Sequence, residues 1–564
     1  MTKKPAVHDL NARMAASRPE EGARLLAGLN ATDAFNLLLE HPQPGRVVIH
    51  LPAESLYLMM MELGPEDALI LLELASPEQV QSFIDLDCWD RDRLNVHKAR
   101  TWFLLVNELE DDAFVRNFRR MDLSLLVAFF YRHLRVLKLD NPDDEIVQDG
   151  LTLLTPDGRH LIQFTCNREI SRLINALLLR LSRLDLDLFL ELLEAIYWEA
   201  GPEVEESAYQ ERVGRLESRG FPEYHAAIEI LATVDLERFR PAEKIAPPAT
   251  AENPEAVFAS SQYLIRYEHP ETLLRRVLAR PFDGREEVSV EIMGLANMAV
   301  IADRTPFFEL EKVRRLVSRT DGYISISLEY LTGDNLEQAR DLLLHRRIID
   351  LHKIGRTLVL QTVKQARQLL PRVALDRRNA AALLLDGPEG ELLAGLLQPE
   401  PVRFADNEAL LWTERRQVDE TLARLARLER LVDLLATRLG ITPETVKTLD
   451  LDGTNLPMAA DLSFRVLFNT FRCHDLLGRT PSLTPLTPPD LAALARLVVN
   501  RRVRPAFSAK AQRQFAAWVA AQVEPEAVAG VQEILDRYTA ALAEELARAD
   551  LAPPFRHEVL IRLR

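Results

Sequence analysis

Short apolar runs alternate with helix-start signals along the first 95 residues of the chain. The signals are Asn-Ala-Thr-Asp, Leu-Pro-Ala-Glu, Gly-Pro-Glu and Ser-Pro-Glu, and the apolar runs that follow them span residues 34–39, 56–63, 68–74 and 80–86. Proline suits the first helical position because it lacks a hydrogen-bond donor, and the acid after it meets the positive end of the helix dipole. Helices of about ten residues are unstable alone and must stack on their neighbours. The pattern therefore predicts a solenoid of short helices over residues 1–140.

A change of periodicity marks one β-hairpin after this region. Residues 99–109 and 123–137 are strongly apolar and continue the helices. Two alternating, β-rich segments then flank a tight-turn sequence in which glycine supplies the positive φ; these are Gly150–Thr155, Pro156-Asp157-Gly158 and His160–Thr165. The pattern predicts a single hairpin at about 150–165, within a region (141–240) whose other segments are helices that pack on it.

Two proline-rich stretches divide the remainder of the chain. The predicted fold class is all-α with one minor β-hairpin. Beyond residue 240 we predict a linker (241–256), a central helical unit (257–400), a helical unit with a long amphipathic helix at 407–439 (401–478), a second linker (479–490) and a C-terminal helical unit (491–564).

Two resemblances accompany this layout. The segments LNATDAFNLLLEHP, LPAESLYLMMMELGPEDALILLELASPEQ and FIDLDCWD, within residues 20–95, resemble the cytoplasmic N-terminal superhelix of MgtE-type magnesium transporters, a regulatory domain. A related superhelix occurs in flagellar motor switch proteins. In the transporters, nucleotide-binding-type modules and a membrane domain follow, and neither pattern follows here. The resemblance therefore implies a packing style and an interaction role.

The second resemblance concerns the whole layout. A solenoid followed by GYISISLEYLTGDNLEQARDLLL, which begins at Gly322, is similar to an uncharacterised bacterial domain-of-unknown-function family. That likeness implies architecture only.

Composition and charge narrow the class of partner. The chain is 47% hydrophobic and 27% charged, as globular proteins are, and its net charge of −16 arises mainly before residue 260. An acidic face disfavours nucleic acid and suits a basic protein surface, or it only keeps the protein soluble. No apolar stretch is long enough to span a membrane. The three cysteines are too far apart in the sequence for a disulfide framework or a zinc site; they are Cys88, Cys166 and Cys473. No signal peptide is evident, so we predict a cytoplasmic protein.

Four acids crowd one short segment and are the candidate metal ligands: Asp85, Asp87, Asp90 and Asp92. An EF-hand loop needs alternating acids, a central glycine and a distal glutamate. Trp89 occupies the position of the third ligand, and the glycine is absent. Helix-end capping and solvation are the alternative to a weak divalent site.

The sequence Asp450-Leu451-Asp452-Gly453-Thr454 copies the DxDGT loop of haloacid-dehalogenase-type phosphatases. That chemistry requires the loop to end a buried strand, so that the carboxylates meet magnesium and phosphate. The residues before it read as a capped helical turn, and no alternation of strands and helices follows. The context favours a plain surface turn.

A basic patch lies on a predicted helix: Arg346, Arg347, Lys353 and Arg356. It would suit a phosphate, an acidic partner or the chain's own acidic N-terminal half. Alternatively, the arginine stems only cover apolar helix surface.

The chain contains no P-loop, GxGxxG, HExxH, GxSxG or CxxC motif, so we assign no catalytic residue and no cofactor. The leading hypothesis is a non-enzymatic scaffold or regulatory adaptor that binds another protein through a solenoid face. The first alternative is an enzyme of unfamiliar type that uses acidic residues in a helical cleft. The second is a regulatory protein that responds to divalent cations.

Overall fold

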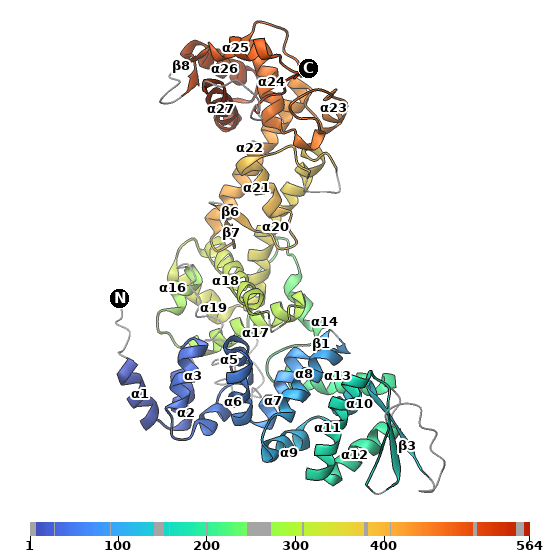
Figure 1. Cartoon of the computed structure of the whole chain (residues 1–564). Coiled ribbons are helices and arrows are strands. Elements are labelled where there is room, and N and C mark those ends of the chain that lie inside the picture. Colours follow the sequence, from blue (N-terminus) through green and yellow to red (C-terminus); the bar gives the residue numbers. More distant parts are fainter. Residues whose placement is uncertain are drawn as a thin grey trace. The chain divides into compact units, whose positions relative to one another are not determined.

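The computed structural model is predominantly helical, with a few short strands, which confirms the all-α prediction (Figure 1). Two compact units are distinguished, Met1–Ile324 with Leu331–Lys353, and Ser325–Tyr330 with Ile354–Arg564. The structure describes residues 7–26, 29–90, 92–139, 152–156, 158–198, 201–244, 272–306, 309–376, 382–405, 408–499, 505–548 and 558–563.

Short helices open the first unit, and Figure 1 shows the earliest of them following one another in a row. They are α1 (Val7–Ala16), α2 (Pro19–Leu26), α3 (Ala31–Leu39), α4 (Pro44–Ile49), α5 (Ala53–Leu63), α6 (Pro65–Leu74), α7 (Pro77–Asp87), α8 (Val96–Asn107), α9 (Asp111–Arg120) and α10 (Leu123–Tyr131). Local capping chemistry sets their starts. The Asn30 side chain accepts a hydrogen bond from the backbone N–H of Asp33, 2.8 Å away, and Ser76 and Gln79 form a reciprocal capping box.

The early helices of this series contact the next helix but one in the chain, and not only the helix that follows directly. Thus α1 contacts α3, α2 contacts α4, α3 contacts α5, α4 contacts α6, and α5 contacts α7. The helices therefore form two layers, one odd-numbered and one even-numbered. A continuous apolar core runs through them from Met14 to Ala208. The amide of Gln79, buried at the start of α7, donates to the carbonyls of Val48 and Leu51 at 2.8 and 2.7 Å, which satisfies backbone acceptors between α4 and α5.

The predicted hairpin is present as β4 and β5, and a third strand, β3, joins it to form a three-stranded antiparallel sheet. Its strands, in spatial order, are β3 (Leu134–Lys138), β5 (His160–Phe164) and β4 (Thr152–Leu154). The prediction that helix continues to residue 137 was wrong. Helix α10 ends at Tyr131, and the chain then alternates, with Leu134 and Val136 buried beside exposed Arg135. Val136 pairs with Ile162, so long-range strand pairing outweighs local helix propensity here. Gly150, Leu151 and Asp157 of the predicted hairpin lie outside the described residues.

Helices α11 (Arg168–Leu184), α12 (Leu186–Trp198) and α13 (Gly201–Glu217) follow, and α13 packs on α10 and α7. Arginines along α13 anchor it. Arg215 Nε and Nη2 donate to the two carboxylate oxygens of Asp85 at 2.8 and 3.0 Å, and its Nη1 donates to Asp122 at 2.7 Å. Arg212 Nε donates to the carbonyl of Asp85 at 2.8 Å. One arginine therefore joins the end of α7 to the start of α10 through a third helix.

The first unit is completed by α14 (Tyr224–Ala227), η1 (Ile228–Leu231), α16 (Leu273–Leu278), α17 (Arg285–Asp303), the greater part of α18 (Leu310–Thr332), α19 (Leu336–His345) and the start of α20 (Ile348–Val373). Helices α14 and η1 contact α17. The first residues of the predicted linker 241–256 are hydrogen-bonded, since the N–H of Ala242 donates to Asp350 and that of Lys244 to the carbonyl of His345. The remainder, from residue 245, lies outside the described part of the chain, as do residues 257–271 of the predicted central unit.

Helix α27 (Pro525–Ala547) packs on most neighbouring elements of the second unit: α22 (Arg415–Leu439), α24 (Phe464–Leu476), α25 (Pro488–Ala495), β8 (Val498–Val499), β9 (Ala506–Phe507) and α26 (Ala509–Gln522). The other elements are α21 (Gly387–Leu396), β6 (Arg403–Ala405), β7 (Glu408–Leu410), α23 (Pro443–Lys447) and η2 (Ala459–Asp461). At Gly530 of α27, a Cβ would lie 2.6 Å from Cδ of Arg427, so glycine permits the close approach to α22. The long helix predicted at 407–439 begins only at Arg415, because residues 408–410 pair with β6.

Residues Glu558–Leu563, here called the C-terminal strap, close the apolar core of the second unit. Val559, Leu560 and Ile561 are buried. Leu486 N–H donates to the carbonyl of Leu560, and its own carbonyl accepts from Arg562 N–H, both at 2.8 Å. The strap therefore fixes part of the segment 479–490 that composition alone predicts as a linker.

The Arg215→Met substitution should lower the free energy of unfolding of the first unit by about 3 kcal/mol, because it leaves the Asp85 carboxylate, 2% exposed, without its cation. Urea denaturation would measure the loss. The matched control is Arg238→Met, which removes an 89%-exposed guanidinium 3.8 Å from Asp235 and should cost less than about 0.5 kcal/mol. Equal losses in the two variants would contradict the anchoring role.

Truncation of the strap core by Ile561→Ala should destabilise the second unit by about 3 kcal/mol, since the side chain is fully buried. Leu563→Ala, at a 45%-exposed position two residues away, should have little effect. Chemical denaturation of the full chain would compare them. A tolerated Ile561→Ala would mean that the strap contributes nothing to this unit.

Candidate functional site

Two of the four candidate metal ligands are held by cations or donors of the chain. Asp85 binds Arg215, as described above. One oxygen of Asp87 lies 3.2 Å from Lys98 Nζ, and the other accepts the indole N–H of Trp102 at 2.8 Å. Both carboxylates therefore have structural partners.

The other two candidates lie near the β1 (Trp89–Asp90) and β2 (Arg93–Leu94) turn. Asp90 accepts a hydrogen bond from Asn95 Nδ2 at 2.8 Å, and Asp92 is exposed. Trp89, which precedes both aspartates, is buried, with the Arg212 guanidinium 5.4 Å from its ring. Within the described residues, no three His, Cys, Asp or Glu side chains are arranged to hold a metal ion.

The predicted basic patch lies on the connection between α19 and α20, which holds Arg346 and Arg347, and on α20 itself. Its first three members pair with acids from residues 229–243. Lys353 Nζ lies 2.6 Å from Glu229 Oε1, and Arg347 lies 3.7 Å from the same oxygen. Arg346 Nη1 lies 3.3 Å from Glu243 Oε1. The hydrogen bond from Lys353 is the main cause of a lowered pKa at Glu229.

The fourth member of the patch, Arg356, lies further along α20 in the stretch assigned to the second unit and is partly buried. The structure therefore brings three of the four basic residues together with acids of the chain's own N-terminal half.

Successive short helices expose large apolar side chains. Leu39 of α3, Ile49 of α4, Met61 of α5 and Ile70 of α6 are 49, 55, 37 and 44% exposed. Since α3 contacts α5 and α4 contacts α6, each layer carries two such residues on neighbouring helices. We use the name α3–α6 face for this set of four residues, two of them in each layer. None of the described helices combines the length and hydropathy of a bilayer span.

Sequence reasoning missed a cluster where α12 meets the sheet. Tyr197 and Trp198, at the end of α12, have ring centroids 5.0 Å apart at 82°, and the Nζ of Lys138 lies 4.8 and 5.1 Å from them. Glu194 Oε2 lies 2.7 Å from Lys138 Nζ and accepts the Trp198 indole N–H at 3.1 Å. Glu194 Oε1 lies 3.2 Å from Nε2 of buried His160. We call Glu194, Tyr197 and Trp198 the aromatic corner.

Two local signals pointed towards this cluster, namely the Tyr-Trp pair that ends a leucine-rich helix and the acid one turn earlier. The lysine comes from a strand that the sequence did not predict. Its hydrogen bond is the main cause of a lowered pKa at Glu194, so that carboxyl group stays ionised.

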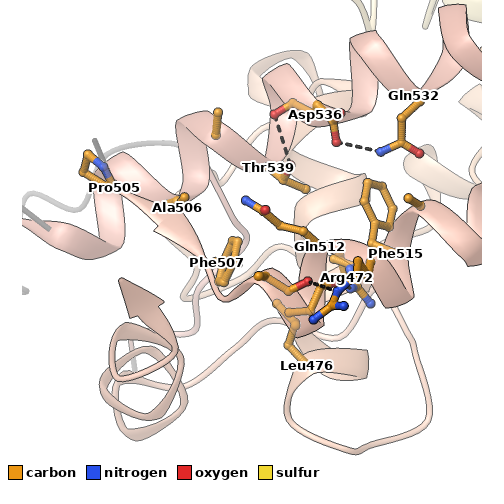
Figure 2. A pocket seen from close by; sticks show the side chains of 16 residues that line it. Arg472, Leu476, Pro505, Ala506, Phe507, Gln512, Phe515, Gln532, Asp536 and Thr539 are labelled. Atoms are coloured by element: carbon orange, nitrogen blue, oxygen red, sulfur yellow. Dashed lines mark hydrogen bonds between the residues drawn. The ribbon is translucent and has the colours of Figure 1, made fainter. Parts of the chain in front are cut away.

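A cavity of about 570 Å³ lies among α24, β9, α26 and α27 in the second unit (Figure 2). Much of its lining is alanine and aromatic. The lining residues are Arg472, Leu476, Pro505, Ala506, Phe507, Ala509, Ala511, Gln512, Arg513, Phe515, Ala516, Gln532, Asp536, Thr539, Ala540 and Ala543.

Some polar side chains of this cavity form hydrogen bonds with other groups of its lining. Gln532 Nε2 donates to Asp536 Oδ1 at 2.6 Å, and Arg472 Nη2 donates to the carbonyl of Ala511 at 3.4 Å (Figure 2). Burial lowers the pKa of Arg472, whose guanidinium lies 4.9 Å from the Phe515 ring. Asp536 is the one carboxylate, and no histidine is present, in the described lining.

The DxDGT sequence forms a turn, as predicted, and this turn holds the C-terminal strap. Thr454 Oγ1 donates to the carbonyl of Leu451 at 2.7 Å, and the carbonyl of Gly453 accepts from Leu563 N–H at 2.7 Å. Asp450 Oδ2 lies 3.2 Å from Nη2 of Arg562. The first aspartate therefore has a structural partner.

Two carboxyl groups meet where α27 faces the strap. Glu545 Oε2 accepts the backbone N–H of Glu558 at 3.2 Å. Burial, reinforced by the Glu558 carboxylate, raises the pKa of Glu545 to about 7. Arg465 lies 2.8 Å from Glu558 Oε1 and Arg548 is near Glu545, so both cations oppose that shift.

The second unit should lose stability as pH rises through 7. The folded pKa of Glu545, about 7, lies above its ordinary 4.5, so protonation favours folding. This contribution is complete below pH 4.5 and is lost above 7. Glu545→Gln should reduce the loss between pH 5 and 8, measured by denaturation at both values.

The control is Glu544→Gln, at the exposed neighbouring position on α27. It should leave the pH dependence of stability unchanged. If Glu545→Gln also leaves the pH dependence of stability unchanged, the carboxyl group of Glu545 is not the source of that dependence.

The model of a family described as "Family of unknown function (DUF6178)" matches residues 11–562. No curated protein and no solved structure matches the chain. The likeness of residues 20–95 to the transporter superhelix stays a resemblance.

Proposed function

We propose that this chain, which belongs to the family of unknown function DUF6178, is a non-enzymatic scaffold or regulatory adaptor that binds another protein through a helical solenoid face. The observation that carries the proposal is the α3–α6 face. Four large apolar side chains on four successive helices are 37–55% exposed.

Layered packing supports this role. Helices that contact their second neighbours are stacked on one another, and stacked helices of this kind can present long surfaces to a partner. The arginines of α13 occupy Asp85 and Asp122 on α7 and at the start of α10. The exposed apolar residues of α3–α6 lie on earlier helices and are available to a partner.

Charge suggests the kind of partner. The net charge of −16 arises mainly from the N-terminal half, so a basic protein surface would be attracted to it. Three of the four predicted basic-patch residues already bind the chain's own acids, which favours intramolecular docking over an external acidic partner for that patch. The unpaired Cys88, Cys166 and Cys473 suit a reducing compartment such as the cytoplasm.

The alternatives have weaker support. A catalytic cleft needs two carboxylates, or a histidine and an acid, facing a cavity, and the described lining of the cavity in Figure 2 supplies one carboxylate. A divalent-cation sensor needs available carboxylates, whereas Asp85 and Asp87 are bound by Arg215 and Lys98.

Cross-linking of the tagged protein in cells, followed by mass spectrometry, tests the proposal. The native chain should capture one reproducible protein partner. A variant with serine at all four α3–α6 face positions (Leu39→Ser, Ile49→Ser, Met61→Ser, Ile70→Ser) should capture at least about tenfold less, because apolar anchors dominate interface energies.

The matched control replaces exposed apolar residues of the second unit: Met458→Ser, Leu497→Ser and Val499→Ser. Both variants should have the same unfolding temperature as the native chain, since every altered side chain is exposed. Equal capture by the native chain and the α3–α6 variant would refute binding through this face.

A further inference from the structure

The aromatic corner has the composition of a site for a positively charged alkyl group. Two ring faces stand at 82°, and a carboxylate lies between them and the strand. The faces of aromatic rings carry negative potential and attract cations, and paired rings are the usual means of holding substituted ammonium groups. We propose that Glu194, Tyr197 and Trp198 form a binding site for an alkylammonium group, which Lys138 fills here and which a lysine of another protein can occupy in its place.

Lys138 shows what the site accepts. Its ammonium nitrogen lies within 5.1 Å of both ring centroids and 2.7 Å from Glu194 Oε2. A simple surface ion pair would involve the carboxylate alone. Here one ammonium group contacts two rings and one carboxylate from the same helix.

The carboxylate is held in place by two further groups. The Trp198 indole N–H donates to Glu194 Oε2 at 3.1 Å, and His160 Nε2 lies 3.2 Å from Glu194 Oε1. His160 is 4% exposed, and its Nδ1 has no partner. The Nε2–H tautomer satisfies both observations, because it donates to Glu194 and leaves only an acceptor nitrogen unpaired. The carboxylate is therefore oriented before a ligand arrives.

The internal lysine is replaceable. The Lys138 and Glu194 side chains are 34 and 42% exposed, and Trp198 is 73% exposed, so solvent reaches the site from outside. Ion pairs at such positions contribute little to stability, so an incoming ammonium group can displace Lys138 once it overcomes the effective concentration of the tethered lysine. An acidic N-terminal half also raises the local concentration of basic segments.

The site lies on α12 and β3, apart from the α3–α6 face, so this proposal does not rest on the proposed adaptor function. Protein labelled with 5-fluorotryptophan would report on Trp198 directly by ¹⁹F NMR, with Trp198→Phe identifying its signal. The probe is Nα-acetyl-lysine methylamide, compared with the uncharged norleucine analogue and with choline.

Lys138→Ala should open the site. The lysine probe should then shift the Trp198 signal saturably, with an affinity at least about fivefold above that of the native chain, whereas Lys138→Arg should keep the site filled. Adding Glu194→Gln to Lys138→Ala should weaken binding about fivefold. Circular dichroism would verify folding.

No saturable shift with Lys138→Ala, or an equal shift with the norleucine analogue, would overturn the proposal. Choline bound more than about tenfold tighter than lysine would overturn the assignment to a protein lysine, because a small quaternary ammonium compound would then be the better ligand.

Discussion

Burial of the Asp85 carboxylate beneath Arg215 is the contact on which the N-terminal unit most depends. A charge that is 2% exposed can be retained only if it is paired and hydrogen-bonded. Arg215 provides two hydrogen bonds, Gln81 Nε2 provides a third at 3.0 Å, and the second arm of the same guanidinium reaches Asp122. Because these groups come from α7, α10 and α13, one buried charge links elements that are far apart along the chain.

In the second unit, ion pairs likewise join segments that are far apart along the chain. The C-terminal strap buries three apolar residues there and forms backbone hydrogen bonds with Leu486 and Gly453. Arg465 holds the start of the strap through Glu558, and Arg562 holds its end through Asp450. These ion pairs therefore hold both ends of the strap in place, and the raised pKa of Glu545 is a consequence of that packing.

Many charged side chains of this protein form ion pairs with other residues of the same chain. The acids and bases that look most chemical in the sequence, such as Asp85, Lys353 and Asp450, are bound to groups of the same chain. Large apolar and aromatic side chains are accessible at the α3–α6 face and at the aromatic corner. These accessible side chains are the basis of both proposals.

Local chemistry determined what could be predicted. Proline at the first helical position, Asn30 and Ser76 as caps and the glycine turn at residue 158 act within a few residues, so the starts of the short helices, the all-α class and the turn at residues 450–454 follow from the sequence itself. The charge asymmetry, which suggested intramolecular docking of the basic patch, is likewise visible in composition.

Only the tertiary structure decided which charges meet and which segments pair. The apolar residues from Leu134 could extend a helix, and they form a strand because β5 offers partners about 26 residues later. Lys138 reaches the aromatic corner for the same reason, and Asp85 meets Arg215 across 130 residues. Contacts of this kind depend on long-range packing, and no local pattern encodes them.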